Sequence, residues 1–529
     1  MRVNHSLIQK NHTAMKKTYF LTFLLSLVMI TTSLAQDNKI IINADQELST
    51  ISRHIYGHFA EHLGDGIYGG IWVGEDSEIP NTNGFRTDVL EALQQLEVPN
   101  IRWPGGCFAD EYGWKDGIGP RSERPHRLNT HWGMVLEDNS FGTHEFLNFT
   151  EMLGAEPVIA MNVGSGTPRE MQQWIEYVNF DGDSELANLR RENGRQEPWG
   201  VKYVGIGNES WGCGGNMSPE YYSDLYRRFA TYVRNYSGNR IYRIASGFSD
   251  DRYAWTETVM EHAANMMDGI SLHYYTIAGE SWSHKGASVD FGEDLYFSGL
   301  RKALWLDRYI KGHITRMDKF DPGKRVALVV DEWGIWTDPL PGTNPGFLQQ
   351  QNSLRDALIA AISLDIMNKH SDRVRMANIA QMVNVLQAVI LTEGDKMVKT
   401  PTYHVFDLYR VHFDTNLLQT HTDISNYVYG DEEIPAISIT ASKSENGRIN
   451  LTISNLDPHN GKDVEIEIRG QNVARVHSGK LLTANEMNAV NTFDNPDNVV
   501  LQDFDNHELY GNTLTLTLPS KSLVTVTVQ

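Results

Sequence analysis

Two glutamates have the surroundings expected of reactive carboxyl groups. Glu209 lies in the segment GIGNESWGCGG and Glu332 in the segment LVVDEWGIW, and each follows a short apolar run and has tryptophans nearby. Hydrolysis of a glycosidic bond requires a proton for the leaving oxygen and a carboxylate on the other face of the sugar, and two glutamates can supply both. Each glutamate taken alone can also be a solvated loop residue, so the prediction depends on the fold bringing the two together.

Further polar residues end similar apolar runs, and they are Glu61, His62, Arg102, Asn208, His273, Tyr274 and Tyr275. Each also has an ordinary structural interpretation. Asn208 can cap a turn, and His273 and Tyr275 can belong to the core. Asn208 can equally bind a sugar hydroxyl beside the acid, because its amide both donates and accepts hydrogen bonds.

The elements that must position these residues follow a repeating pattern of one apolar run and one helix-like segment. The apolar runs are residues 54–59, 100–106, 157–164, 201–209, 243–249, 269–275, 325–334 and 377–386. Near-continuous apolar strands that alternate with helices are typical of parallel strands buried on both faces. Eight such units predict an α/β fold of the (β/α)8 TIM-barrel type, in which catalytic residues lie at the carboxyl ends of the strands.

The pattern changes after about residue 405, where apolar and polar residues alternate with a period of two and no helix-like segments intervene. This alternation predicts an antiparallel β-sandwich of the jelly-roll kind. We therefore expect a catalytic barrel over residues 51–400 and a C-terminal sandwich over 401–529. The strand-like segment KIIINAD lies within residues 36–50, and we expect it to pair into the sandwich.

The segment from His58 to His62 matches H-x-x-E-H, the spacing of a zinc peptidase site, in which the ligands share one helical face. Gly57, Gly64 and Gly66 surround the segment, and it emerges from a strand-like run. These features argue against a helix, so we predict no metal site and no cofactor.

Composition excludes several classes of partner. The chain of 529 residues carries 67 acidic and 46 basic side chains and a formal charge of −21. This balance disfavours binding to nucleic acid or to an anionic membrane, both of which need clustered lysine and arginine. With only two cysteines, Cys107 and Cys213, neither a disulfide framework nor a cysteine-rich metal site is expected.

The N-terminal segment resembles an export signal. Lys16 and Lys17 precede the apolar run YFLTFLLSLVMI, and small residues follow at Ser33 and Ala35. This order predicts a secretory signal over residues 1–35, cleaved after Ala35, with residues 1–14 as an upstream extension. The interpretation predicts a periplasmic or secreted protein that has no membrane attachment once the signal is removed.

Six segments occur in the order IYGHFAEHLGDGIYGGIWVG, NIRWPGGCFADEYGWKDGIGP, KYVGIGNESWGCGGN, SLHYY, VDEWGIW and IAQMVNVLQAVI. Together they resemble the retaining α-L-arabinofuranosidases of glycoside hydrolase family 51, and the resemblance covers essentially the whole chain after the signal segment. It implies a barrel, a β-sandwich built from both chain ends, and release of terminal arabinofuranosyl units from arabinan, arabinoxylan or their oligosaccharides. It also implies assembly into hexamers or other oligomers.

The resemblance assigns roles to individual residues. Glu209 would be the acid/base and Glu332 the nucleophile of a double displacement, in which the same acid later activates the water. The residues that would hold or line the sugar are Glu61, Asn208, His273, Tyr275, Trp336 and Gln381. The alternatives are a retaining barrel glycosidase acting on xylan or β-glucan, and a carbohydrate-binding protein without turnover.

Cys107 departs from the family pattern, because many members carry asparagine at this position. We expect it to line the sugar pocket as a small, weakly polar residue. A bond to Cys213 would require Cα atoms within about 7 Å, and strands two and four are not neighbours in a barrel. We therefore predict two free thiols.

Overall fold

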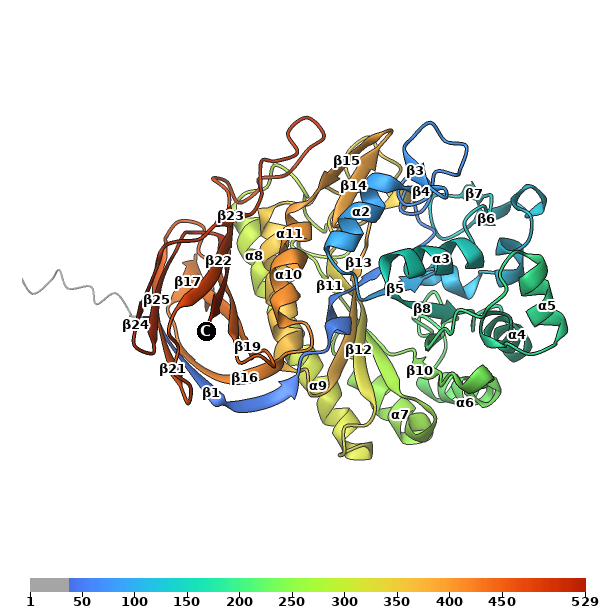
Figure 1. The fold of residues 1–529 in the computed structure, drawn as a ribbon, viewed down its shortest axis with the longest axis horizontal. Coiled ribbons are helices and arrows are strands. Elements are labelled where there is room, and N and C mark those ends of the chain that lie inside the picture. Colours follow the sequence, from blue (N-terminus) through green and yellow to red (C-terminus); the bar gives the residue numbers. More distant parts are fainter. Residues whose placement is uncertain (1–37) are drawn as a thin grey trace, which may run out of the picture.

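The computed structural model describes residues 38–529, and eight parallel strands close into a barrel within it (Figure 1). In the order of the barrel, they are β10 (Tyr242–Ala245), β11 (Gly269–Thr276), β12 (Ala327–Ile335), β13 (Val374–Ala380), β2 (Gly57–Phe59), β5 (Asn100–Trp103), β8 (Glu156–Met161) and β9 (Tyr203–Ile206). Each apolar run of the sequence contributes one strand, so the predicted barrel is confirmed.

Helices surround this barrel. Within residues 38–529 the α-helices are α2 (Thr87–Gln95), α3 (Thr143–Leu153), α4 (Pro168–Asn179), α5 (Glu185–Glu192), α6 (Pro219–Tyr232), α7 (Tyr253–Ala263), α8 (Glu293–Ala303), α9 (Trp305–Phe320), α10 (Leu354–Lys369) and α11 (Pro401–Tyr409). Local sequence sets several of their starts. The side chains of Thr167 and Ser218 accept backbone N–H groups in the first turns of α4 and α6, and a proline opens each helix.

Strand β12 is buried along its whole length, because helices cover the outside of the barrel and side chains fill the inside. Its parallel register with β11 places His273 opposite Glu332 near the carboxyl ends of the two strands. This register brings together two of the residues singled out in the sequence.

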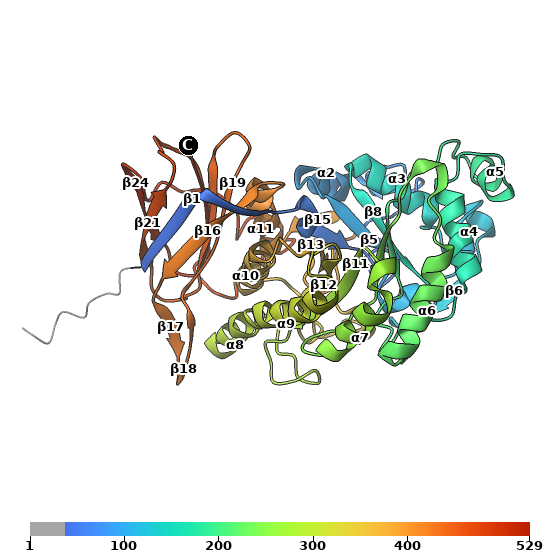
Figure 2. The same ribbon diagram turned by 90° about the horizontal axis from the view of Figure 1, so that it is seen from below.

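The C-terminal domain is one curved sheet of ten strands beside the barrel (Figures 1 and 2). In order across the sheet, they are β23 (Gln502–Asp503), β22 (Val476–Leu482), β26 (Ser522–Val528), β20 (Ile449–Asn455), β19 (Ile437–Lys443), β16 (Asn416–Asp423), β1 (Asn38–Thr50), β21 (Lys462–Arg469), β25 (Thr513–Leu518) and β24 (His507–Tyr510). The first strand, β1, pairs antiparallel with β16 and parallel with β21. Among the described strands of this sheet, β1 and β21 form the one parallel pair, and the other pairs follow the predicted antiparallel pattern.

Four short hairpins complete the described strands: β3 (Asn81–Thr82) with β4 (Phe85–Arg86), β6 (Arg127–Asn129) with β7 (Val135–Glu137), β14 (Ile390–Glu393) with β15 (Lys396–Lys399), and β17 (Asn426–Tyr429) with β18 (Glu432–Pro435).

Helices α10 and α11 lie between the barrel and the sheet (Figure 2). Asp365 of α10 is buried at this junction and accepts hydrogen bonds from the hydroxyls of Tyr409, Ser438 and Thr440 at 2.7, 2.6 and 2.6 Å. These bonds satisfy a buried carboxylate and fix the sheet against the barrel.

No helix among residues 38–529 has both the length and the apolar character needed to cross a bilayer. The predicted signal segment, residues 1–35, lies outside the described residues.

Candidate active site

The carboxyl ends of the barrel strands surround a cavity of about 580 Å³. Its lining residues are Glu61, Leu63, Gly106, Cys107, Trp132, Glu209, Trp211, Phe248, Ser249, Asp250, Arg252, Tyr275, Trp282, Glu332, Trp336, Leu348, Gln381 and Leu386. Asn208 and His273, which the sequence also singled out, lie buried behind this wall. A larger groove of about 820 Å³ elsewhere on the barrel is lined by none of the predicted site residues.

Glu332 is held on both of its oxygen atoms. The Arg102 guanidinium donates a hydrogen bond to Oε1 at 2.8 Å, and the Tyr275 hydroxyl donates to Oε2 at 2.8 Å. The Glu332 side chain is only 8% exposed. A carboxylate fixed in this way has one orientation toward the cavity, and a nucleophile needs such an orientation.

Glu209 lies closer to solvent, with a side chain that is 20% exposed. Its backbone turns sharply after β9 with φ of +37°, in the left-handed region that disfavours residues with a side chain. Backbone strain of this kind persists where the surrounding structure imposes it, often at functional sites. At this turn Glu209 lines the cavity.

The backbone at Glu209 gives a testable consequence for stability. Glu209→Gly and Glu209→Ala both remove the carboxyl group, but only glycine adopts a positive φ without steric cost. We expect the glycine variant to be more stable than the alanine variant by about 1 kcal/mol. Chemical denaturation of the two variants side by side measures this difference. An alanine variant equal to or more stable than the glycine variant would show that the turn is unstrained.

His273 lies between the two glutamates. Its Nδ1 atom is 2.9 Å from Oε1 of Glu209 and 3.5 Å from Oε2 of Glu332, and its Nε2 atom is 3.2 Å from Oδ1 of Asp331. Burial alone would lower the pKa of this imidazole. The charge of Glu332, the hydrogen bonds to Asp331 and Glu209 and the charge of Asp331 outweigh burial and raise the pKa to about 10. His273 is therefore a cation that links the carboxyl groups.

The raised pKa of His273 makes stability depend on pH. Because the folded-state pKa lies above the ordinary value of 6.5, the stabilisation is complete below pH 6.5 and is lost as the pH rises toward 10. We expect the free energy of unfolding to fall by up to about 1.4 kcal/mol per pH unit across that window because of this residue. In His273→Gln this contribution should be absent. Denaturation curves at pH 6.5, 8 and 9.5 measure it, and equal slopes for the two proteins would contradict the assignment.

Arg102 was seen in the sequence only as part of a polar strand end, yet it organises the site. In addition to Glu332, it donates from Nη2 to Oδ1 of Asn208 at 2.7 Å, and its Nε atom lies 3.5 Å from Oδ2 of Asp331. The guanidinium packs 4.6 Å from the centroid of the Phe59 ring. An arginine at the end of an apolar strand was the signal available, because a buried arginine needs carboxylate partners.

Glu61 is another buried carboxyl group that lines the cavity. Its Oε1 accepts hydrogen bonds from the indole of Trp132 at 2.9 Å and from the backbone N–H groups of Gly106 and Phe108. Gln381 donates to its Oε2 at 3.2 Å. Burial, together with the charge of Glu332, raises the pKa of Glu61 to about 7 despite these donors. Trp132, on the hairpin of β6 and β7, was not predicted from the sequence.

Aromatic rings wall the opening of the cavity. Trp336 meets Tyr275 edge-on with ring centroids 5.0 Å apart, and Trp282 meets Trp336 at 5.4 Å. On another side Trp211 and Phe248 stack at 4.2 Å. Such rings offer flat apolar faces of the kind that pack against sugar rings.

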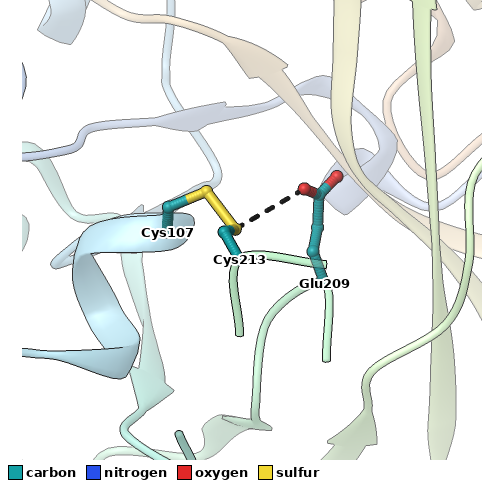
Figure 3. Close-up of side chains that lie close together, drawn as sticks. All are labelled: Cys107, Glu209 and Cys213. Carbon is teal, nitrogen blue, oxygen red and sulfur yellow. Dashed lines mark hydrogen bonds between the residues drawn. A yellow bond between two sulfur atoms is a disulfide. The ribbon is translucent and has the colours of Figure 1, made fainter. Parts of the chain in front are cut away.

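The predicted pair of free thiols is wrong. Cys107 and Cys213 form a disulfide with Cα atoms 5.5 Å apart (Figure 3). Strands β5 and β9 are indeed separated by β8, but the prediction ignored the loops. Cys107 begins the 3-10 helix η2 (Cys107–Asp110), whose Asp110 binds backbone N–H groups of both Gly164, after β8, and Asn208, after β9. The loops thereby meet over the end of β8.

The H-x-x-E-H motif does not form a metal site. His58 is on β2 and packs against the ring of Phe406, and His62 contacts Glu137 at 3.3 Å. Among residues 38–529, the groups whose ligand atoms converge are Cys107 with Glu209 and Cys213, and Glu209 with His273 and Glu332. The disulfide removes the thiolates of the first group, and the second group consists of His273 and the two glutamates described above.

One carboxylate oxygen of Glu209 and one of Glu332 lie within 4.8 Å of each other. Inverting glycosidases separate their carboxyl groups by about 6.5–9.5 Å to admit a water molecule, whereas retaining enzymes separate them by about 5–5.5 Å. The spacing fits attack by one carboxylate on a sugar whose leaving group is protonated by the other.

Comparisons with known proteins point in the same direction. The family profile of the α-L-arabinofuranosidase 1 domain matches residues 92–287, and that of the α-L-arabinofuranosidase C-terminal domain matches residues 331–522. An intracellular exo-α-L-arabinofuranosidase from Bacteroides ovatus is 50% identical over 94% of this chain and 97% of its own length.

Two solved structures are similar over nearly their whole length. The GH51 arabinofuranosidase from Xanthomonas axonopodis pv. citri is 51% identical, covers 93% of this chain and 100% of its own, and superposes with a TM-score of 0.92. The α-L-arabinofuranosidase from Thermotoga maritima, solved as an arabinose complex, is 32% identical over 93% of this chain and 99% of its own, with a TM-score of 0.81.

The barrel, the paired carboxyl groups and these matches define the class of protein as a glycoside hydrolase. Within that class, the chain belongs to the α-L-arabinofuranosidases of glycoside hydrolase family 51.

The same comparisons correct one expectation. Export to the periplasm or the medium was predicted from residues 1–35, but the Bacteroides ovatus relative of 50% identity is named an intracellular enzyme. A basic stretch before a short apolar run is a pattern of composition, and it does not by itself establish export.

Proposed function

We propose that this protein releases terminal α-L-arabinofuranosyl groups from arabinan, arabinoxylan or their oligosaccharides with retention of configuration. Membership of family 51 supports the sugar, because the relative of 50% identity is named an exo-α-L-arabinofuranosidase. The observation that carries the mechanism is the approach of the Glu209 and Glu332 carboxylates to within 4.8 Å at the end of the barrel.

We assign the nucleophile to Glu332. It is the more buried of the pair, and Arg102 and Tyr275 hold its two oxygen atoms at 2.8 Å. Attack on the anomeric carbon forms a glycosyl ester. The Glu332 carboxylate loses its negative charge when the ester forms. Arg102 also donates a hydrogen bond to Asn208, and this bond keeps the guanidinium in place during the step.

We assign the acid/base to Glu209, which is the more exposed carboxyl group of the pair, with a side chain that is 20% exposed. It protonates the leaving oxygen in the first step and takes a proton from water in the second. His273, which contacts both carboxyl groups, stabilises negative charge on whichever of them is ionised at each step.

Sugar recognition is assigned to the floor and walls of the cavity. The backbone N–H of Glu61 donates to the side-chain oxygen of Gln381, and the Gln381 amide donates back to the Glu61 carboxyl group. Both side chains line the cavity, where they offer hydrogen-bond donors and acceptors to sugar hydroxyls. Tyr275 and Trp336 provide a ring wall beside Glu332. Asn208, buried behind the wall, acts in this proposal by orienting Arg102.

Hydrolysis of a panel of aryl glycosides tests the proposal. The α-L-arabinofuranoside should be cleaved with a kcat/KM at least about 100-fold above those of the β-D-xyloside and β-D-glucoside, because a site with buried polar groups rejects analogues that leave them unpaired. Faster cleavage of the xyloside or the glucoside would show that arabinofuranose is not the preferred sugar. If none of the three glycosides is cleaved, a carbohydrate-binding protein without turnover would be favoured.

A further inference from the structure

The disulfide between Cys107 and Cys213 lies directly against the proposed acid/base. Sγ of Cys213 is 3.7 Å from Oε2 of Glu209 (Figure 3). A disulfide sulfur has no proton to donate, so this contact becomes a hydrogen bond only when Glu209 carries the proton. The two sulfurs and one carboxylate oxygen lie within 4.8 Å of one another.

Reduction of this bond would change the chemistry of the cluster. Two thiols beside a carboxylate form a ligand set that suits a borderline-soft divalent ion such as Zn²⁺, and such a set is complete once one water molecule fills the fourth tetrahedral position. We propose that the Cys107–Cys213 disulfide conceals an inhibitory zinc site, which a dithiol reductant opens and which uses Glu209 as its third ligand. The inhibitory part rests on the proposed function of Glu209.

The loops that carry the ligands are held without the disulfide. Asp110, in the same short helix as Cys107, accepts backbone N–H groups of Val163, Gly164 and Asn208 at 2.8, 2.8 and 3.2 Å. The backbone N–H groups of Gly106 and Phe108, on either side of Cys107, also donate hydrogen bonds to the Glu61 carboxyl group and hold this segment in place. Opening the S–S bond therefore leaves both loops facing each other.

The loop that carries Glu209 and Cys213 is a tight turn. The N–H groups of Gly212 and Gly214 both donate to the backbone oxygen of Glu209, at 2.7 and 3.2 Å. A side chain at Gly214 would overlap the backbone oxygen of Asn208, so the turn has little room to rearrange. Two sulfurs bound to one tetrahedral zinc ion lie about 3.8 Å apart, a separation that side-chain rotation can reach from Cα atoms 5.5 Å apart.

The redox step is balanced by the reductant. A thiolate of the external dithiol attacks one sulfur, and the second thiol then displaces the other cysteine, so the reductant becomes a disulfide and the protein gains two electrons and two protons. Zinc binding then releases the two thiol protons to solvent as two Zn–S bonds form. Zinc on Oε2 prevents Glu209 from donating a proton to the leaving group, and the ion occupies space beside Cys107, which lines the cavity.

The experiment compares oxidised and dithiol-reduced protein, each freed of excess reductant and titrated with Co²⁺ and then Zn²⁺. Thiol titration of the folded protein should find two thiols after reduction, and Co²⁺ should then produce thiolate charge-transfer absorption that Zn²⁺ abolishes. With free zinc at about 100 times the measured Kd, hydrolysis should fall to about 1% and return when a chelator is added. The oxidised protein should show neither effect.

Two variants serve as controls, each compared with its own rate in the absence of metal. Cys107→Ser/Cys213→Ser removes every thiol of the chain and should be insensitive to zinc in both redox states. Glu209→Gln keeps both thiols and should bind cobalt more weakly than the reduced parent protein. The proposal is overturned if the folded protein resists the dithiol, if reduced protein binds no cobalt, or if the serine variant is inhibited equally. A protein that binds cobalt only when reduced but cleaves no glycoside would refute the proposed function and leave the metal site standing.

Discussion

Replacing Glu332 by alanine is expected to lower kcat for aryl α-L-arabinofuranosides by on the order of 10⁴-fold or more, because no other group can form the glycosyl ester. The small side chain leaves room beside the anomeric carbon. Added azide should enter there and restore turnover, giving the glycosyl azide of inverted configuration. Rates measured by release of the aryl group, with the azide product identified by NMR, test both statements.

Glu433→Ala is a matched control for this variant, because Glu433 is an exposed glutamate on β18, in the hairpin beside the C-terminal sheet. It should keep the parent rate and show no azide effect. A retained azide product from Glu332→Ala would contradict the assignment of the nucleophile.

Replacing Glu209 by alanine is expected to lower kcat/KM by about 10²–10⁴-fold for substrates with poor leaving groups, because their departure requires a proton. A dinitrophenyl arabinofuranoside needs little protonation, so its glycosyl ester should still form and then accumulate. Azide needs no general base and should release that ester as the glycosyl azide of retained configuration. Pre-steady-state release of the dinitrophenolate and NMR of the product are the measurements.

The dependence on the leaving group separates this role from a structural one. A variant that loses the same factor on every leaving group would have lost a structural contact and not a proton donor. An inverted azide product would exchange the roles of Glu209 and Glu332.

Much of the fold could be predicted from the sequence because barrel strands are buried on both faces. Burial of that kind leaves near-continuous apolar runs, and the polar residues that end them stand at the edge where the site forms. Glu209 and Glu332 were identified in this way, and the closed barrel does carry both to one cavity. The partners of β1, which are β16 and β21, could not be predicted from the sequence. The alternation of apolar and polar residues within one strand does not show which strands lie beside it or in which direction they run.

The parts of the site that were missed depend on contacts between distant segments. Arg102 binds Glu332 across 230 positions of the chain, and Trp132 reaches Glu61 from a hairpin that interrupts the barrel. The disulfide was excluded by counting strands, whereas the loops after β5 and β9 meet through Asp110. Strand order constrains the barrel wall, but it does not constrain the paths of the loops above it.

The covalent intermediate provides the most direct test of the central claim, that Glu332 attacks an arabinofuranosyl group. An aryl 2-deoxy-2-fluoro-α-L-arabinofuranoside with a good leaving group should form the ester faster than water removes it, because fluorine at C2 destabilises both oxocarbenium-like transition states while the leaving group assists only the first step. Mass spectrometry of the proteolysed protein should then find one fluoroarabinosyl group on the peptide that contains Glu332, and none in the Glu332→Ala variant. A label on any other residue, or steady turnover to inverted product without a label, would contradict the account.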